Sequence, residues 1–403
     1  MSTARIGIFA THPIQYQVPI WRGLAALPNA DLTVYYFSDR SLRGGHDPEF
    51  GRNISWDVDL LGGYRSIFLA RDADLSAPNR MRLQHSDIKE LERLDWVCIN
   101  GYIHGFERQI VRLRRRNRYR VFIRGEFSDE GRGELGALGN RARKLVRSFY
   151  LHWFYSRVDA FGVVGVAARR HLESLGVEPS RTFSSPYCID TTSLKAQVQR
   201  HDRSAARERL GIAASSVVIL FSGKLVPWKG PLLLGEAVTS LPDEAVLVYV
   251  GDGPLRTEIE RRLRPRLQQR LIMPGFVNQS SLGSFYAAAD ISVLPSERDK
   301  WGLVVNEAQQ FALPVIVSDQ VGCRHDLVVE GETGFVFPFG DVEALAARLR
   351  QLLASRALRE SMGAAGRRRV MTSYTPEAAV RGIATAMGLG THTSASQSHE
   401  PEG

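Results

Sequence analysis

Short apolar runs alternate with helical stretches along almost the whole chain of 403 residues. In the first half, the strand-like runs lie at residues 5–10, 32–37, 95–100, 120–123 and 160–164. In the second half, they lie at residues 217–221, 245–250, 270–273, 291–294 and 315–318. Strands that alternate with helices predict parallel sheets covered by helices on both faces. Because 403 residues are many for one such domain, the sequence predicts an α/β protein of two doubly wound domains.

The boundary between the domains is expected in a polar, charged stretch at residues 190–216. We divide the chain into a first domain at residues 1–195, a second domain at residues 196–375 and a C-terminal segment at residues 376–403. The tail that starts at Gly388 is rich in Ser, Thr, His and Gly. This composition cannot bury a core, so we predict that the tail is disordered.

The cysteines and the hydropathy pattern predict a cytoplasmic protein. Cys98, Cys188 and Cys323 lie far apart without metal-ligand spacing, which is typical of reduced thiols in the cytosol. No secretory signal pattern is visible, and no run approaches the roughly 20 apolar residues that span a bilayer. No Asp-x-Asp pair follows a predicted strand, so we expect neither a bound metal ion nor a resident cofactor.

The formal net charge of +9 is concentrated in the first half. Eight arginines lie between residues 108 and 124, and residues 141–144 form a second basic cluster. Such charge suits nucleic acid, anionic lipid or an acidic substrate. Nucleic acid is disfavoured because residues 112–118 lack aromatic side chains that stack on bases. Residues 141–157 fit two interpretations equally: a peripheral segment on the anionic inner face of a membrane, or a core helix with a basic start.

Two lysines follow the first predicted strand of the second half. Residues 221–230 read Phe-Ser-Gly-Lys-Leu-Val-Pro-Trp-Lys-Gly and place Lys224 and Lys229 between a strand and a helix. Ligands of parallel sheets bind at the carboxyl ends of strands, and a helix N-terminus adds partial positive charge there. The lysines therefore fit a diphosphate site, although by themselves they are equally explained as surface residues of a loop.

Two further patterns follow later strands. Gly251-Asp252-Gly253-Pro254 comes after a buried run, and glycine lets a ligand approach the backbone closely. Asp299 and Glu307 lie eight residues apart, one in a loop and one in the first turns of a predicted helix. Carboxylates accept hydrogen bonds from sugar and ribose hydroxyls, whereas an isolated acidic pair more often complements the helix dipole.

Taken in order, these segments resemble the retaining family 4 glycosyltransferases of GT-B fold. The resemblance covers about residues 160–375 and rests on six segments: 223–230, 251–254, 274–277, 294–296, 299–307 and 331–335. It implies two Rossmann-like domains that face each other across a cleft. The first domain would bind the acceptor, and the second would bind the nucleotide-sugar donor.

The resemblance also assigns roles to residues of the second domain. Lys224, where the family usually has arginine, and Lys229 would hold the donor diphosphate. Asp299 stands in place of a family glutamate and would contact the donor sugar, with Glu297 as a rival. Glu307 would bind the ribose hydroxyls. The remaining donor-binding candidates are Gly223, Gly251, Gly253, Phe276, Val277, Gly302, Leu303 and Val304.

The first domain departs from the family near the reacting centre. The family often carries a histidine after a strand in the middle of this domain, but residues 121–126 read Val-Phe-Ile-Arg-Gly-Glu. Arg124 and Glu126 are candidates to replace it. His104 and His12 are further candidates on the acceptor side.

The implied activity is transfer of a hexosyl group from a UDP- or GDP-linked sugar to a hydroxyl acceptor with retention of configuration. The acceptor would be a glycan or a lipid-linked saccharide, as in polysaccharide biosynthesis. The alternative is a nucleotide-sugar epimerase of related GT-B fold, which the order of the carboxylate motif disfavours.

Overall fold

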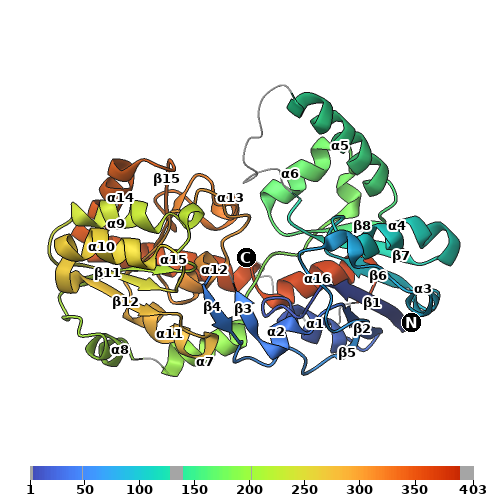
Figure 1. Ribbon diagram of the computed structural model, residues 1–403, viewed down its shortest axis with the longest axis horizontal. Helices are drawn as coiled ribbons and strands as arrows, with labels where there is room; N and C mark the ends of the chain where they lie inside the picture. Colours follow the sequence, from blue (N-terminus) through green and yellow to red (C-terminus); the bar gives the residue numbers. More distant parts are fainter. Residues whose placement is uncertain (1–2, 48, 128–138, 201, 391–403) are drawn as a thin grey trace, which may run out of the picture.

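The computed structural model describes residues 3–47, 49–127, 139–200 and 202–390. Two α/β domains lie side by side, each built on a parallel sheet (Figure 1). The first sheet has the strand order β5-β2-β1-β6-β7-β8-β9, and the second has the order β12-β11-β10-β13-β14-β15. In both, the order reverses beside the first strand of the domain, as in doubly wound folds. The predicted α/β architecture is confirmed.

The elements of the first domain have the following bounds. Its sheet contains β1 (Ala4–Ala10), β2 (Ala30–Tyr36), β5 (Arg65–Phe68), β6 (Trp96–Ile99), β7 (Arg120–Gly125), β8 (Ala160–Val163) and β9 (Thr182–Ser184). Its helices are α1 (Val18–Ala25), α2 (Arg40–Arg43), α3 (His85–Leu91), α4 (Gly105–Asn117), α5 (Gly139–Tyr155) and α6 (Val166–Ser174). A separate antiparallel hairpin consists of β3 (Gly45–Asp47) and β4 (Arg52–Ile54).

The second half of the chain supplies the second sheet and most of the remaining helices. The strands are β10 (Val217–Ser222), β11 (Ala245–Val250), β12 (Leu271–Gly275), β13 (Ile291–Leu294), β14 (Val315–Ser318) and β15 (Gly334–Phe337). The helices that precede β13 in the chain are α7 (Thr191–Arg200), α8 (Arg203–Arg209), α9 (Pro231–Thr239), α10 (Arg256–Leu267) and α11 (Gln279–Ala288). The later helices are α12 (Leu303–Gln310), α13 (Arg324–Leu327), α14 (Val342–Ala354), α15 (Arg356–Ser373) and α16 (Pro376–Met387).

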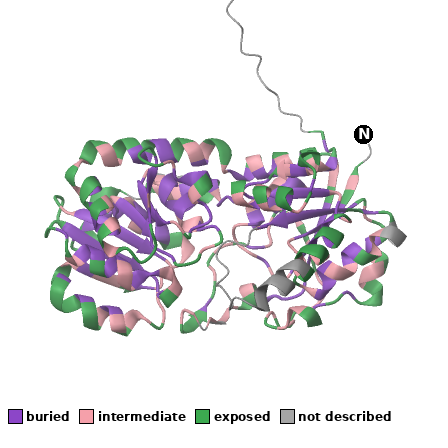
Figure 2. Cartoon of the chain, turned by 90° about the horizontal axis from the view of Figure 1, so that it is seen from above, coloured by how far each residue is buried: buried purple, intermediate pink, exposed green. Residues whose placement is uncertain are grey.

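Burial explains why the central strands are nearly continuous apolar runs. Every residue of β10 and β11 is buried, because helices cover both faces of the sheet. Figure 2 shows this division, with buried residues along the strands and exposed residues on the outer faces of the helices. The carboxyl ends of β10 and β11 face the first domain, because the following glycines, Gly223 and Gly251, line a cavity that first-domain residues also line.

The chain crosses between the domains twice. It first crosses before α7, which packs against α11 and α12 of the second domain. It returns through α16, which packs against α1 and β9 of the first domain. Ile383 and Met387 of α16 are buried in one cluster with Ile8 and Trp21. Leu389, which we assigned to the tail, is buried in the same cluster, and residues 391–403 lie outside the described part of the chain.

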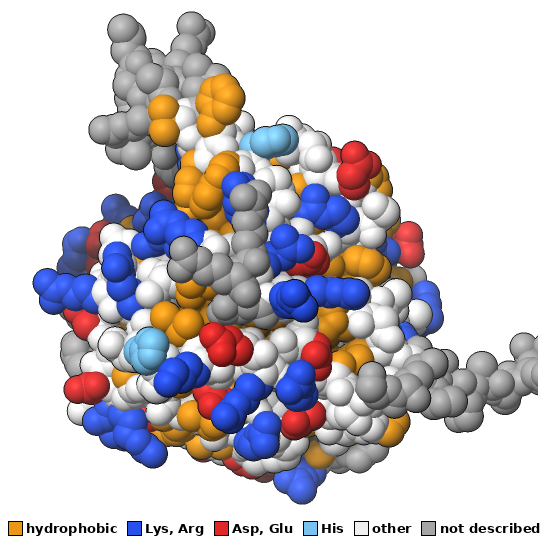
Figure 3. All heavy atoms as spheres, turned by 90° about the vertical axis from the view of Figure 1, so that its right-hand side faces the viewer, with side chains coloured by type: hydrophobic (Ala, Val, Ile, Leu, Met, Phe, Trp, Pro, Cys, Tyr) orange, Lys and Arg blue, Asp and Glu red, His pale blue; other side chains and the backbone are white. Residues whose placement is uncertain are grey.

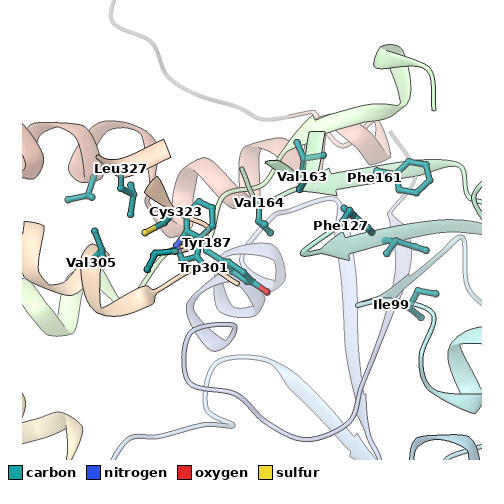
Figure 4. Close-up of a cluster of buried hydrophobic side chains, with 14 of the residues drawn as sticks. Ile99, Phe127, Phe161, Val163, Val164, Tyr187, Trp301, Val305, Cys323 and Leu327 are labelled. Carbon is teal, nitrogen blue, oxygen red and sulfur yellow. The ribbon is translucent and has the colours of Figure 1, made fainter. Parts of the chain in front are cut away.

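An apolar seam joins the two domains. The ring of Trp301 meets that of Tyr187 edge-on at 5.6 Å, and Figure 4 shows both rings between Val164 on one side and Cys323 on the other. Beside this seam, the backbone N–H of Val166 donates to the Asp326 carboxylate of the second domain, at 3.1 Å to each oxygen. The seam fixes how the strand ends of the two sheets face each other.

The described part of the chain contains no helix long and apolar enough to cross a membrane. The three cysteines are buried and unbridged.

Candidate active site between the domains

Glycines let the loops at the carboxyl ends of β10 and β11 lie against each other. Gly223 has φ 153° and Gly251 has φ 142°, and a Cβ on Gly251 would lie 1.8 Å from the carbonyl oxygen of Gly223. A Cβ on Gly253 would lie 2.6 Å from the carbonyl oxygen of Leu225. No side chain fits at these contacts, so the glycines are required by loop packing as well as by any ligand.

A cavity of about 260 Å³ lies at these strand ends, and we call it the aromatic cavity. The second domain lines it with Gly223, Gly251, Phe276, Val277, Leu303, Val304 and Glu307. The first domain contributes Tyr16, Phe50 and Trp56. The ring of Phe50 meets that of Phe276 edge-on at 5.3 Å. This lining of aromatic and apolar side chains from both domains suits a flat, partly apolar group.

Glu307 lies in the aromatic cavity, on the buried face of α12. Its carboxylate accepts a hydrogen bond of 2.6 Å from the hydroxyl of Tyr286 on α11. Burial raises the pKa of Glu307 to about 7, although the Tyr286 hydrogen bond acts in the opposite direction. Near neutral pH this carboxyl therefore changes between an acceptor and a donor of hydrogen bonds.

A second cavity of about 340 Å³, the lysine cavity, adjoins the first through Tyr16 and Leu303, which line both. Its charged lining includes Lys229, Asp299 and Lys300. Lys229 forms an ion pair with Asp299. Gly302, with φ 95°, turns the chain from this loop into α12. Anionic and hydroxyl groups could be held here by one ammonium, one carboxylate and the first backbone amides of α12.

The structure separates the two rival acids of the carboxylate motif. Asp299 lines the lysine cavity and is held by a bond of 2.8 Å from the Gly322 N–H to its carbonyl oxygen. Glu297 is exposed and lines none of the three cavities described here. Of the two, Asp299 is thus the one placed to contact a ligand.

Lys224 has a different environment from Lys229. Its ammonium donates to the Asp47 carboxylate at 3.1 Å and also pairs with Glu49, both from the β3–β4 hairpin of the first domain. It lies 4.9 Å from the centre of the Phe50 ring. Lys224 lines neither the aromatic nor the lysine cavity in this arrangement.

A third cavity of about 130 Å³, the arginine cavity, is lined mainly by the first domain. Its polar lining comprises Gln17, Asn100, Tyr102, Arg124, Glu126, Arg147, Tyr155, His171, Tyr187 and Lys300. Glu126 also lines the lysine cavity and lies 3.7 Å from the Lys300 ammonium. Burial raises the pKa of Glu126, while Lys300 and the Tyr187 hydroxyl act against this shift. Glu126 therefore stands where the two cavities meet.

The other first-domain candidates have structural partners. Arg124 is buried and donates to Ser185 Oγ at 2.9 Å and to the Pro186 carbonyl at 2.8 Å, so it holds the connector between the domains while lining the arginine cavity. The backbone N–H of His104 donates to Glu107 at 2.8 Å in a capping box that begins α4. Burial, with Arg40 and His104 nearby, lowers the pKa of His12 to about 4. Neither histidine lines any of the three cavities.

Several residues of the site escaped the sequence analysis. Tyr16, Phe50, Trp56 and Tyr187 come from loops of the first domain that carry no motif. For Lys300, the sequence does carry a signal, which is the rarity of lysine. The chain has only six lysines among its 52 basic residues, and Lys224, Lys229 and Lys300 are three of them. Because most other basic residues of the chain are arginines, the clustering of these three lysines around the cleft indicates a functional site.

The described arginines between residues 108 and 124 do not form one patch. Arg114 pairs with Asp159, Arg120 lies 5.5 Å from the centre of the Trp96 ring, and Arg124 is buried. The side chains of residues 115, 116 and 141–144 lie outside the described part of the structure.

Helix α5 is apolar on two faces. Leu151, Phe154 and Tyr155 are buried in the first domain, whereas Val146 and Phe149 are 70% and 75% exposed. Figure 3 shows hydrophobic side chains close to Lys and Arg side chains on this end of the molecule. The helix therefore combines a core face with an exposed apolar face.

Comparison with known proteins gives sequence matches that centre on the second domain. Residues 202–369 match the family described as Glycosyl transferases group 1. A D-inositol 3-phosphate glycosyltransferase of Geodermatophilus obscurus is 33% identical over 236 residues, which cover 54% of this chain and 50% of that protein. The chain thus matches about half the length of this curated relative.

Solved structures are similar over almost the whole chain. Sucrose-phosphate synthase of Thermosynechococcus elongatus has a TM-score of 0.66 at 19% identity and covers 95% of this chain and 98% of its own. HepE of Anabaena in complex with UDP-glucose has a TM-score of 0.66 at 16% identity, covering 96% and 99%. At these identities the similarity establishes the fold, and the predicted GT-B arrangement is confirmed.

Proposed function

We propose that this chain, in which residues 202–369 form a domain of the group 1 glycosyltransferase family, moves a sugar from a nucleoside diphosphate to an acceptor hydroxyl. One observation carries the proposal: the aromatic cavity, with Glu307 in its lining, adjoins the lysine cavity through Tyr16 and Leu303. A nucleoside in the first cavity would direct its diphosphate and sugar into the second.

The donor would be bound in three parts. The base would lie against Phe276 and Val277, and Glu307 would accept hydrogen bonds from the ribose hydroxyls. Lys229 and Lys224 would neutralise the diphosphate. Asp299 would accept a hydrogen bond from the sugar, once Lys229 turns to the phosphate.

The chemical step would retain configuration at the anomeric carbon. The bond between that carbon and the diphosphate oxygen breaks, and the acceptor oxygen forms its bond on the same face. The departing phosphate oxygen takes the proton of the acceptor hydroxyl. Lys229 and the amides of Leu303 and Val304 at the start of α12 would stabilise the charge that develops on the phosphate. On this proposal the reaction needs neither a metal ion nor a resident cofactor.

The acceptor would enter through the arginine cavity, where Glu126 meets the lysine cavity. We propose a glycan or lipid-linked saccharide as acceptor, as in polysaccharide biosynthesis, and a UDP- or GDP-linked hexose as donor. Binding of UDP-glucose by the structurally similar HepE supports a nucleotide-sugar donor.

We further propose that the protein works in the cytoplasm and contacts the anionic inner face of a membrane through α5. The exposed Val146 and Phe149 would insert into the interface, and Arg157, just after the end of the helix, would face lipid phosphates.

Donor turnover tests the function. Thermal-shift screening of UDP, GDP and their sugars identifies the donor first, because a ligand of the folded state raises the melting temperature. Lys229→Ala and Glu307→Ala should then lose most transfer activity, and full activity in both would refute the site. Incubation with the donor alone discriminates the epimerase alternative, which predicts an epimerised sugar without acceptor.

A further inference from the structure

The β3–β4 hairpin of the first domain reaches across the cleft and closes over the donor side of the second domain. The segment that follows β4 is held against the second domain by two contacts. Asn278 Nδ2 donates to the Ser55 carbonyl at 2.7 Å, and the Ser280 N–H donates to the Asp57 carboxylate at 3.3 Å. Figure 1 shows the hairpin beside the second domain, away from the strands of the first sheet. The hairpin is therefore a fixed bridge in this arrangement.

The tip of the hairpin places two carboxylates on one ammonium. Lys224 donates to Asp47 at 3.1 Å and 3.4 Å and also pairs with Glu49. Asp47 is oriented by the backbone N–H groups of Glu49 and Phe50, which donate to it at 2.9 Å and 3.2 Å. Burial acts to raise the pKa of Asp47, but Lys224 and these two amides outweigh it and hold the pKa below its ordinary value.

The same tip forms part of the aromatic cavity. Phe50 contacts Phe276 edge-on, and the Lys224 ammonium lies 4.9 Å from the centre of the Phe50 ring. Arg52 lies 5.4 Å from the centre of the Phe276 ring and 3.8 Å from the Asp252 carboxylate. Any movement of the acidic tip away from Lys224 therefore also moves the outer wall of the cavity.

We propose that Asp47 and Glu49 are an internal competitor for the donor diphosphate, occupying Lys224 until the donor displaces them. This inference rests on the proposed function, which assigns Lys224 to the diphosphate. A diphosphate and two carboxylates around one ammonium would leave three anionic groups in contact, which Coulomb repulsion opposes. The donor must therefore exchange with the hairpin carboxylates at Lys224.

The test compares nucleotide binding by isothermal titration calorimetry in the presence of EDTA. The double variant Asp47→Asn/Glu49→Gln keeps the shape of the tip and removes its charge. We expect the Kd for UDP, or for GDP if that is the nucleotide that binds, to fall about fivefold. The Kd for the matching nucleoside, which has no phosphate, should not change. The control Asp31→Asn/Glu90→Gln removes the same charges from exposed pairs with Arg65 and Arg93 and should leave both Kd values unchanged.

Results that would overturn this inference differ from the result that would overturn the proposed function. An unchanged or higher Kd for the nucleotide in the double variant would overturn the inference, because the carboxylates would then be neutral toward the diphosphate or assist it. An equal gain for the nucleoside would also overturn it, since the effect would come from the aromatic wall and not from charge. If neither UDP nor GDP binds to the wild type or to the double variant, the proposed function itself fails. Melting temperatures of both variants establish that they are folded.

Discussion

The hydroxyl of Tyr286 donates a buried hydrogen bond of 2.6 Å to the carboxylate of Glu307. The tyrosine comes from α11 and the acid from α12, so a hydrogen bond between two helices orients a carboxyl that lines the aromatic cavity. Because burial raises its pKa to about 7, this carboxyl titrates near neutral pH.

The first prediction concerns stability against pH. The pKa of Glu307 is higher in the folded than in the unfolded chain, so the folded state binds the extra proton and stability falls as pH rises toward and through about 7. Glu307→Gln removes this titration. Relative to the variant, the wild type should lose melting temperature between about pH 5 and pH 8, measured by thermal unfolding in a pH series. Parallel curves of melting temperature against pH for the two proteins would contradict the raised pKa of Glu307.

Tyr286→Phe should raise the pKa of Glu307 further, since the lost hydrogen bond favours the charged form.

The second prediction concerns Lys229. Lys229→Met should lower kcat about 100-fold, because it removes a cation from the departing diphosphate. Steady-state kinetics with a confirmed donor would measure it. The control Lys89→Met removes the same charge from the exposed surface of α3 and should keep the wild-type rate. Equal kinetics in the two variants would exclude Lys229 from the reaction.

The third prediction concerns Glu126. Its position between the lysine and arginine cavities suits contact with the acceptor. Glu126→Gln should raise KM for the acceptor about tenfold, the size of one lost charged hydrogen bond, and leave the Kd for the donor nucleotide unchanged. Glu173→Gln, at an exposed position on α6, is the matched control. A weaker donor Kd with unchanged acceptor KM would assign Glu126 to the donor instead.

The fourth prediction concerns the contact between two loops. Gly251→Ala places a Cβ 1.8 Å from the Gly223 carbonyl oxygen at a φ of 142°, so the loops must separate. We expect a loss of about 3 kcal/mol in the free energy of unfolding, measured with urea, together with loss of nucleotide binding. Gly340→Ala also lies at positive φ but meets no atom within 4 Å, and should cost about 1 kcal/mol with binding retained.

The fifth prediction concerns α5. Phe149→Asp removes an exposed apolar group and should abolish flotation with anionic liposomes. Neutral liposomes should bind neither the wild type nor this variant. Phe339→Asp makes the same change at an exposed site of the second domain and should still float. If the wild type binds no liposome of either kind, α5 is not a membrane segment.

The central part of the fold was predictable because its strands are fully buried. Residues 245–250 and 291–294 were predicted with the bounds of β11 and β13, since both are apolar runs with clear ends. Among the strands at the sheet edges, β12 was predicted as residues 270–273, whereas β5, β9 and β15 were not predicted. In β5 (Arg65–Phe68), no residue is fully buried and Ile67 is 42% exposed, so its sequence lacks an apolar run.

Part of the candidate site was likewise predictable from the sequence, and part was not. Lys229, Asp299 and Glu307 line the cavities because they lie on loops and helices that follow the strands of one sheet, and strand order alone brings them together. The contacts of Lys224 were not predictable. Asp47 lies 177 residues away in the chain, and the pairing depends on how one domain is set against the other. His12 and His104 show the reverse: the family resemblance made them candidates on the acceptor side, but neither lines any of the three cavities.

The return of α16 to the first domain has a consequence for biosynthesis. The cluster around Ile8 and Trp21 is completed only by Ile383, Met387 and Leu389, which are among the last described residues to leave the ribosome. The second domain is thus an insertion within the first, and its own core is complete by α15. During translation the second domain can finish folding while the first, although made earlier, still lacks one of its outer helices. The first domain, although it is synthesised first, therefore cannot be completed until α16 has been made.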